Sequence, residues 1–453
     1  MNSLEKKSLL GLASLYAFRM LGLFMLLPVL SLYAGQYAGS TAILVGVALG
    51  IYGLTQGLFQ IPLGFLSDRI GRKPVIFLGM LVFFCGSIVA AMSDTMWGLI
   101  AGRALQGVGA VASTIMALLS DLTTEQNRTK AMAVIGGSIG VSFAVSMVVG
   151  PILASIWGLS GLFWLTAILA ICGVLILLFV VPSPETYRPN AESQAVPQMF
   201  GKLLRDRELL RLNFGIAVLH FSQMATWISV PLILEQTFSF GREEHWIIYV
   251  SILGLSFICM LPFIIVAESR RKMKPVFVGA VVLLAIGELL LGSGVNDRSI
   301  FLLGLFVFFM AFNLLEATLP SLVSKLAPAG GKGTAMGIYS TSQFLGAFLG
   351  GVIGGIVAHY YGYSGVFWVA AFLVVVWISV AITMKTPLHL KSLVVQLVPE
   401  DRIVIGDYIR LVPGVCDVVI VPEQQLAFFK IDVDNFCPES MEKVLGRKTD
   451  FNF

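Results

Sequence analysis

Charged side chains are scarce in this chain. Asp, Glu, Lys and Arg make up 12% of its 453 residues, whereas hydrophobic residues make up 57%. A soluble domain carries roughly 25% charged residues, so the composition excludes an ordinary soluble globular protein. It predicts an integral membrane protein.

The sequence also lacks the patterns of several other protein classes. Its five cysteines show no CxxC and no paired spacing, so neither a disulfide framework nor a metal site is expected. No GxxxxGK[ST] loop occurs, which disfavours ATP-driven pumping. There is no nucleophile elbow, HExxH or cofactor loop, so we expect no enzyme and no cofactor.

Long apolar runs are abundant instead. Each has the length of roughly 20 residues that is needed to cross a hydrocarbon core. Helices are required, because isolated strands leave backbone groups unsatisfied in lipid and a barrel strand alternates in polarity. The twelve runs lie near residues 9–33, 42–66, 74–92, 97–119, 132–156, 161–181, 210–234, 246–267, 275–293, 299–323, 334–358 and 363–384. The first run is long enough to span, so we predict a retained helix and not a cleaved leader.

Basic residues are distributed unevenly between the connections. The N-terminus and every second connection hold nineteen Lys and Arg residues, whereas the opposite connections hold only Arg242 and Arg298. The positive-inside rule therefore predicts that both termini lie in the cytoplasm. Because the basic residues are membrane-sided, no nucleic-acid partner is expected.

The chain divides into two similar halves. A segment rich in Pro, Glu and Arg follows Val181 and reads as a hinge. Residues 158–164, GLSGLFW, recur as residues 362–368, GYSGVFW, and Ala131-Met132 recurs at the same offset as Ala335-Met336. Duplicated helical halves are typical of transporters. The predicted domains are residues 1–181, a six-helix bundle; 182–209, a cytoplasmic linker; 210–386, a second six-helix bundle; and 387–453, a soluble domain.

The last of these domains cannot span a membrane. Residues 393–398, 416–421 and 427–433 alternate in polarity and are predicted strands, and helices are predicted at 401–411 and 438–445. The order strand, helix, strand, strand, helix suggests a small α+β ferredoxin-like domain, whose fourth strand would have to come from the final residues. Residues 411–433 look like the second half of a heavy-metal-associated domain, but Val398-Pro-Glu-Asp401 replaces the CxxC that such domains use. A structural or interaction module is favoured over a copper carrier.

Residues 68–73 read DRIGRK, and four of these six positions are charged. A solvated turn that only enforces the positive-inside rule explains the basic residues but not Asp68 or the nearby glycines. The residues that match the signature G-x3-D-R-x-G-R-[KR] are Gly64, Asp68, Arg69, Gly71, Arg72 and Lys73. On this motif, and on a degenerate copy at 268–274, the chain resembles the major facilitator superfamily.

The resemblance implies a role for this loop. It implies that Asp68 faces the N-terminus of the eleventh helix, near residues 333–335, where exposed amides carry partial positive charge. It likewise pairs Arg72 with Asp121. Each contact is expected to contribute about 1 to 2 kcal/mol, enough to bias a two-state equilibrium but not to lock it. The hypothesis is a latch that holds the cytoplasmic side shut.

Two further helices resemble family motifs. Arg103 lies inside the fourth helix with Gly107, and either bonds backbone carbonyls or modulates a proton-binding carboxylate. Gly150 and Pro151 of the fifth helix partly match a motif associated with antiporters. That match is incomplete, because Ser146 stands where a glycine is usual. These glycines are also expected simply to permit close helix packing.

Other ionisable residues lie within the apolar runs. Glu316 and His220 are the better candidates for a proton site. Arg19 is a candidate substrate or counter-ion group. Glu288 lies closer to the outer surface, so a solvated edge competes as an explanation. No motif assigns a role to any of these four.

Residues 9–384 resemble the drug-export branch of the superfamily. This implies an all-α membrane protein with twelve helices in two pseudo-symmetric bundles, located in a bacterial inner membrane. The expected function is proton-coupled export of small, somewhat hydrophobic compounds by alternating access, with the lipid bilayer, a small-molecule substrate and protons as partners. Two alternatives remain: an uptake symporter or facilitator, and a membrane sensor whose terminal domain binds a regulatory ligand or protein.

Overall fold

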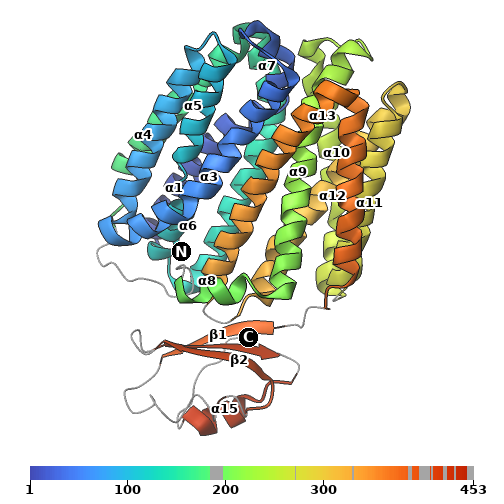
Figure 1. Cartoon of the computed structure of the whole chain (residues 1–453). Helices are drawn as coiled ribbons and strands as arrows, with labels where there is room; N and C mark the ends of the chain where they lie inside the picture. Colours follow the sequence, from blue (N-terminus) through green and yellow to red (C-terminus); the bar gives the residue numbers. More distant parts are fainter. Residues whose placement is uncertain are drawn as a thin grey trace.

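The structure is a computed structural model of the chain. It describes residues 1–183, 197–270, 272–328, 331–385, 390–396, 409, 412–421, 426–432 and 435–445. Two sets of long helices stand side by side, and a small β-sheet lies beyond one end of them (Figure 1). The predicted helix at 401–411 and the predicted fourth strand fall outside the described residues, except for Ile409.

The helices of the first half are α1 (Ser3–Phe24), α2 (Leu30–Tyr33), α3 (Ala42–Ile70), α4 (Arg72–Ala91), α5 (Met96–Val108), α6 (Ala112–Asp121) and α7 (Glu125–Phe179). Those of the second half are α8 (Pro197–Leu203), α9 (Arg207–Gln236), α10 (His245–Ser269), α11 (Met273–Ser293), α12 (Arg298–Leu326) and α13 (Lys332–Ile382). Two short 3₁₀ helices, Ala34–Gln36 and Arg242–Glu244, lie in connections. The predicted first run, 9–33, is divided between α1 and α2, and α5 and α6 together form the fourth run. The other predicted runs match the long helices to within a few residues at most ends, and α8 was not predicted.

Two helices are long enough to cross a membrane twice. Ten helices in the described part of the chain are long and apolar enough to span, and two of these extend over 50 and 51 residues. Each is interrupted by one glycine with positive φ, Gly158 (φ 64°) and Gly362 (φ 76°), where the chain turns back. Counting each as two gives the predicted twelve crossings. The two turns fall at the start of the repeated heptapeptide, so the sequence repeat is also a structural repeat.

Capping side chains explain where several helices begin. Thr41 and Thr95 accept hydrogen bonds from the first-turn amides of α3 and α5, and Asp206 and Asp297 do the same for α9 and α12. These residues satisfy donors that a helix start otherwise leaves unpaired. Each polar residue just before an apolar run therefore determines where that helix starts.

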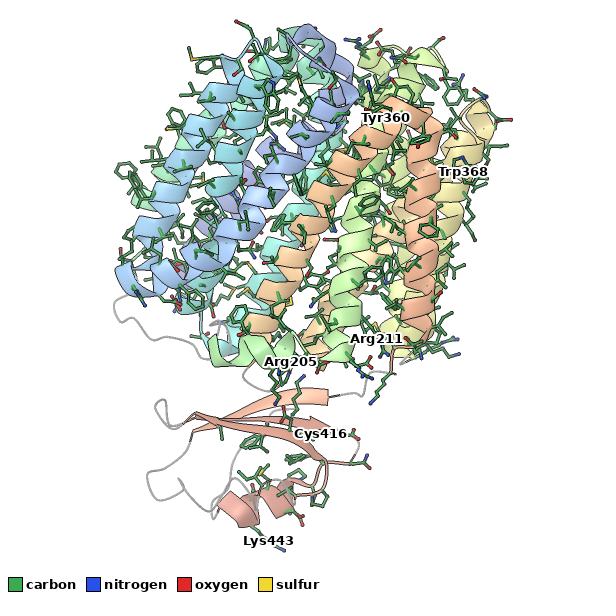
Figure 2. All side chains as sticks on the ribbon, in the orientation of Figure 1. Arg205, Arg211, Tyr360, Trp368, Cys416 and Lys443 are labelled. Carbon is green, nitrogen blue, oxygen red and sulfur yellow. The ribbon has the colours of Figure 1, made fainter. Side chains whose placement is uncertain are left out.

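The ends of the helices differ in how the two halves meet. We call the end that carries residues 64–73 the motif end, and the opposite end, with Gly158 and Gly362, the far end. Tyr360 lies at the far end, whereas Arg205 and Arg211 lie at the motif end beside the small sheet (Figure 2). One apolar core runs through the second half and includes residues 25–37, 45–49, 90–100 and 147–163 of the first half. The rest of the first half has a separate core. Among the described residues, the core that the two halves share therefore lies at the far end.

Close contact between α3 and α13 joins the halves at the far end. A Cβ atom added to Gly50 would lie 2.7 Å from the Phe348 carbonyl oxygen, and one added to Gly53 would lie 2.8 Å from that of Phe344. The contact loosens toward the motif end. At Gly57 the nearest atom is 3.4 Å away, and at Gly337 of α13 no atom lies within 4 Å. The two helices therefore diverge toward the motif end.

The small domain contains a three-stranded antiparallel sheet. Its strands are β1 (Leu390–Gln396), β2 (Val415–Val421) and β3 (Leu426–Asp432), in the order β1-β3-β2, with α15 (Pro438–Leu445) following them. Phe429, Ile431 and Met441 are buried in its core. The strands confirm the three predicted ones within three residues. The order of these described strands is that of the first three strands of a ferredoxin-like sheet.

Substituting Gly50 tests the far-end contact. Gly50→Val places a side chain against the α13 backbone, so we expect it to destabilise this pose by about 1 to 3 kcal/mol and to open the far end. Thiol labelling of a cysteine at Ser31, which is buried and donates to the Trp227 carbonyl oxygen of the other half, should rise on a cysteine-free background. The matched control is Gly136→Val, because a Cβ atom at Gly136 meets no atom within 4 Å. Equal effects of the two variants would contradict the packing described.

Candidate functional site

The charged loop between α3 and α4 is organised around Arg72. Gly71 adopts φ 98°, a conformation open to glycine, and so allows α4 to start directly after α3 ends. The Arg72 guanidinium forms an ion pair with Asp68, donates to Asp121 Oδ2 at 3.3 Å and donates to Ser67 Oγ at 2.7 Å. Arg72 and Asp121 have side-chain exposures of only 5% and 4%. The structure thus brings the three predicted residues together.

The other motif residues surround this group. Lys73 donates to the Val181 carbonyl oxygen at 2.6 Å and to Ser183 Oγ at 3.4 Å, so it fastens the loop to the start of the linker. Arg69 is exposed. A Cβ atom on Gly64 would lie 3.8 Å from Ser113 Oγ on α6, in ordinary contact. The loop therefore lies against both α6 and the chain that leaves α7.

The predicted contact of Asp68 with residues 333–335 belongs to a different pose. It requires α3 and α13 to approach at the motif end, where in this pose they diverge. The contact stays a prediction for the pose in which this end is closed. The described residues of the degenerate copy lie at the corresponding end of α10 and α11; the side chain of Glu268 and residue 271 fall outside the description.

Two buried arginines share one tyrosine in the first bundle. Arg19 Nη2 donates to Tyr52 Oη at 3.0 Å and to Gln56 Oε1 at 2.7 Å. Arg103 packs over the Tyr52 ring, 5.0 Å from its centroid, and donates to the Ala48 carbonyl oxygen at 3.3 Å. The backbone-bonded interpretation of Arg103 is therefore the one that its geometry favours. Both arginines are about 1% exposed, and no ion pair to either occurs within the described segments.

A second polar group lies inside the other bundle. His220 of α9 and Glu316 of α12 are 3.8 Å apart, Nε2 to Oε2. Gln343 of α13 lies between them, with its Nε2 atom 2.8 Å from His220 Nε2 and 3.5 Å from Glu316 Oε1. His220 is largely buried, whereas the Glu316 side chain is 40% exposed. Three helices thus bring a titratable pair and an amide together.

Sequence reasoning did not find Gln343, Tyr52 or Gln56. Each is a polar residue within an apolar run, which is a signal for an interior role, but no motif singles them out. Glu288 needs a correction: it is 0% exposed and its Oε1 accepts from Thr226 Oγ1 at 3.5 Å, so the solvated edge is wrong. It lies between α11 and α9, because the face of α11 that carries it packs inward.

The predicted packing residues lie at close approaches between helices. A Cβ atom on Gly107 would collide with Thr55 and the Tyr52 carbonyl on α3. One on Gly150 would lie 2.6 Å from the Met25 carbonyl oxygen. Pro151 lies inside α7 directly after this contact. These residues serve helix packing in the structure, as glycines commonly do between membrane helices.

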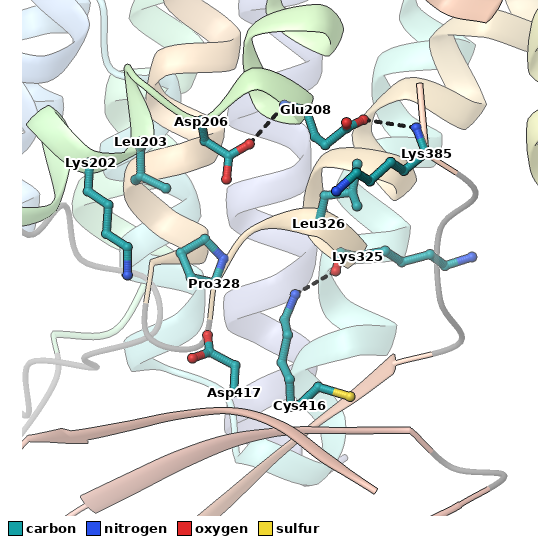
Figure 3. A pocket seen from close by; sticks show the side chains of 11 residues that line it. Lys202, Leu203, Asp206, Glu208, Lys325, Leu326, Pro328, Lys385, Cys416 and Asp417 are labelled. Carbon is teal, nitrogen blue, oxygen red and sulfur yellow. Dashed lines mark hydrogen bonds between the residues drawn. The ribbon is translucent and has the colours of Figure 1, made fainter. Parts of the chain in front are cut away.

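A pocket of about 360 Å³ lies between the small domain and the motif end and is lined by residues of both (Figure 3). The Lys430 side chain reaches from the small domain to α12, where its Nζ atom donates a hydrogen bond to the Lys325 carbonyl oxygen at 2.5 Å. Its lining is rich in lysine and acidic side chains over an apolar base: Lys202, Leu203, Asp206, Glu208, Lys325, Leu326, Pro328, Lys385, Cys416, Asp417 and Lys430. Across the described ranges, no group of three or more His, Cys, Asp or Glu residues could hold a metal ion.

The fold, the loop motif and the comparisons together define the class of this protein. The family model of the Major Facilitator Superfamily matches residues 12–351 and 271–398, so the chain belongs to this superfamily of membrane transporters. Members are transporters and not enzymes. The chain is 48% identical over 430 residues to the inner membrane transport protein YajR of Escherichia coli, covering 94% of each chain.

More distant relatives extend the comparison. The chain is 25% identical over 334 residues to the multidrug resistance protein MdtH of Yersinia enterocolitica, covering 72% of this chain and 80% of that one. The crystal structure of a bacterial homologue of the lysosomal transporter Spinster, in an inward-facing and occupied conformation, matches with a TM-score of 0.67 at 11% identity. That match covers 85% of this chain and 98% of the other. At such identity it shows the fold alone.

Proposed function

We propose that this transporter exports small, somewhat hydrophobic compounds across a bacterial inner membrane in exchange for protons. The observation that carries the proposal is the His220–Glu316 pair inside the second bundle, bridged by Gln343. Burying a titratable pair within a membrane bundle costs free energy, and such pairs therefore commonly mark a transport or proton pathway. The multidrug resistance relative supports the choice of substrate class, and the YajR relative supports the membrane.

The arrangement of the bundles supports alternating access. They share a core at the far end and separate toward the motif end. This is one of the two poses that a rocking mechanism requires. In the proposal the motif end faces the cytoplasm, as the basic residues of the connections predict, so this pose is open to the cytoplasm. Export then needs the reverse pose, in which α3 and α13 meet at the motif end.

In that reverse pose, the loop acts as a latch. Asp68 meets the N-terminus of α13 near residues 333–335 and stabilises the closed motif end through the helix dipole. Arg72 holds Asp68 from the other side and is itself anchored by the buried Asp121. The latch stabilises one pose by an amount small enough that substrate and protons can reverse the preference.

Asp68→Asn tests the latch. The amide removes the charge that the helix terminus attracts, so the closed motif end should lose about 1 kcal/mol, a roughly fivefold shift toward the open pose. Labelling of a cysteine at Gly337, on a cysteine-free background, should rise and transport should fall. The matched control Asp94→Asn removes a carboxylate at the far end. Unchanged labelling and flux in Asp68→Asn would refute the latch.

Glu316→Gln tests proton coupling. In liposomes, an imposed pH gradient should drive ethidium movement by the wild-type protein, and the variant should lose most of that acceleration, about tenfold or more, because it cannot exchange a proton. Movement without a gradient should persist. The control Glu235→Gln alters a carboxylate that pairs with Arg242 at the far end. A gradient response that Glu316→Gln retains would contradict the assignment, whichever compound is carried.

A second candidate function is that of a sensor, and the pocket beneath the motif end favours it. Four lysines and three acidic residues surround a space of about 360 Å³, the size of a small ligand site. In this reading a regulatory ligand binds between the small domain and the bundles, and the helices report its presence.

Deletion of residues 387–453 separates the two functions. A transporter whose domain is accessory should keep gradient-driven movement within about twofold of the full chain, because the His220 cluster is untouched. A sensor whose helices only report the ligand should show no gradient-driven movement, with or without these residues. Flux through liposomes, compared at equal amounts of folded protein, makes the measurement.

A further inference from the structure

Gln343 lies where two different contacts meet on α13. On one side its amide touches His220 and Glu316. On the other, its neighbours in sequence face α3, since a Cβ atom on Gly57 would lie 3.4 Å from Phe344 Cβ and 3.7 Å from the Thr341 carbonyl oxygen. The residue therefore connects the titratable pair to the helix contact that joins the bundles.

The hydrogen bonds of His220 define which ring nitrogen carries the proton in the neutral state. Nδ1 lies 3.3 Å from the Ile216 carbonyl oxygen, which can only accept, so Nδ1 is the protonated nitrogen. Nε2 is then an acceptor. The Gln343 amide, 2.8 Å away, donates to it, and the second amide hydrogen points to Glu316 Oε1 at 3.5 Å.

A proton that binds Nε2 makes this arrangement impossible. The ring then presents an N–H to the amide N–H₂, and two donors cannot share a hydrogen bond. The Gln343 amide must rotate to offer its carbonyl oxygen, or withdraw and let the imidazolium pair with Glu316, 3.8 Å away. Either movement breaks the present contact between Gln343 Nε2 and Glu316. In the exchange proposed above, the proton reaches the Glu316 side chain, which is 40% exposed, from water at the far end in the reverse pose, and it leaves to water at the motif end in this pose.

We infer that Gln343 is the positioning residue that transmits the protonation of His220 to the α3–α13 contact between the bundles. The inference rests on the proposed proton coupling and names how the proton is sensed. His220 and Glu316 pair with each other, and Tyr339 of α13 is a further titratable group that interacts with Glu316. Within the described segments no Lys or Arg pairs with either residue. Glu288 of α11 is bonded instead to Thr226.

The test follows the motif end as a function of pH. A cysteine at Gly337, on a background in which all five native cysteines are serine, is labelled with maleimide in full-length protein in nanodiscs. Its rate is divided by that of a cysteine at Lys443 in the small domain, which cancels the ionisation of the thiol. Between about pH 4 and pH 8 the wild-type ratio should change several-fold, because protonation of His220 Nε2 forces the Gln343 amide to move.

Three variants then test whether Gln343 transmits the protonation of His220. Gln343→Met keeps the length of the side chain without its amide and should give a flat profile. Gln343→Glu, when ionised, offers only acceptors to His220 and favours the protonated ring, so its profile should stay near the low-pH value. The control Ser342→Ala removes a hydroxyl that bonds Ile338 within the helix and should behave as wild type. Folding of each variant is checked by its melting temperature.

The outcomes distinguish the role of Gln343 from the proposed proton coupling. If the wild-type profile depends on pH and His220→Asn abolishes it, but Gln343→Met and Gln343→Glu both keep it, proton coupling stands and the role of Gln343 is overturned. If the wild-type profile is itself flat, both are overturned. A flat profile in Gln343→Met with a normal one in Ser342→Ala is the result expected.

Discussion

The approach of two glycine-lined helices, α3 and α13, is the constraint on which the rest of the structure depends. Gly50 and Gly53 let the α3 backbone approach the carbonyl oxygens of Phe348 and Phe344 to distances that no side chain would permit. The bundles are in contact here at the far end, and the two helices diverge from this contact toward the motif end. The pose, the exposure of the motif end and the position of Gln343 all follow from it.

The charged loop and the buried cluster have complementary places in this arrangement. Arg72, Asp68 and Asp121 form a preassembled group at the end where the bundles part, whereas His220, Glu316 and Gln343 lie deeper, beside the contact itself. A rocking motion changes the surroundings of both groups. In the account proposed above, one group biases the equilibrium and the other makes it depend on protons, because only the second contains a histidine.

Much of this architecture could be predicted from the sequence. The twelve runs, the repeat at Gly158 and Gly362, and the small sheet follow from local pattern, since length and periodicity decide membrane helices and strands. The pairing of Arg72 with Asp121 followed from a family motif. The pose could not be predicted, because one sequence encodes both poses. Gln343 and the burial of Glu288 were missed, because which face of a helix turns inward depends on packing across several helices.

Distances across both ends of the molecule show whether the bundles rock about the α3–α13 contact. Spin labels at Ile70 and Gly337 report the motif end, and labels at Ser40 and Tyr361 report the far end, in nanodiscs at acidic and alkaline pH. Rocking predicts opposite changes: whenever the motif-end distance shortens, the far-end distance lengthens, because α3 and α13 approach each other at one end as they separate at the other. Two distances that stay constant, or that shorten together, would contradict it.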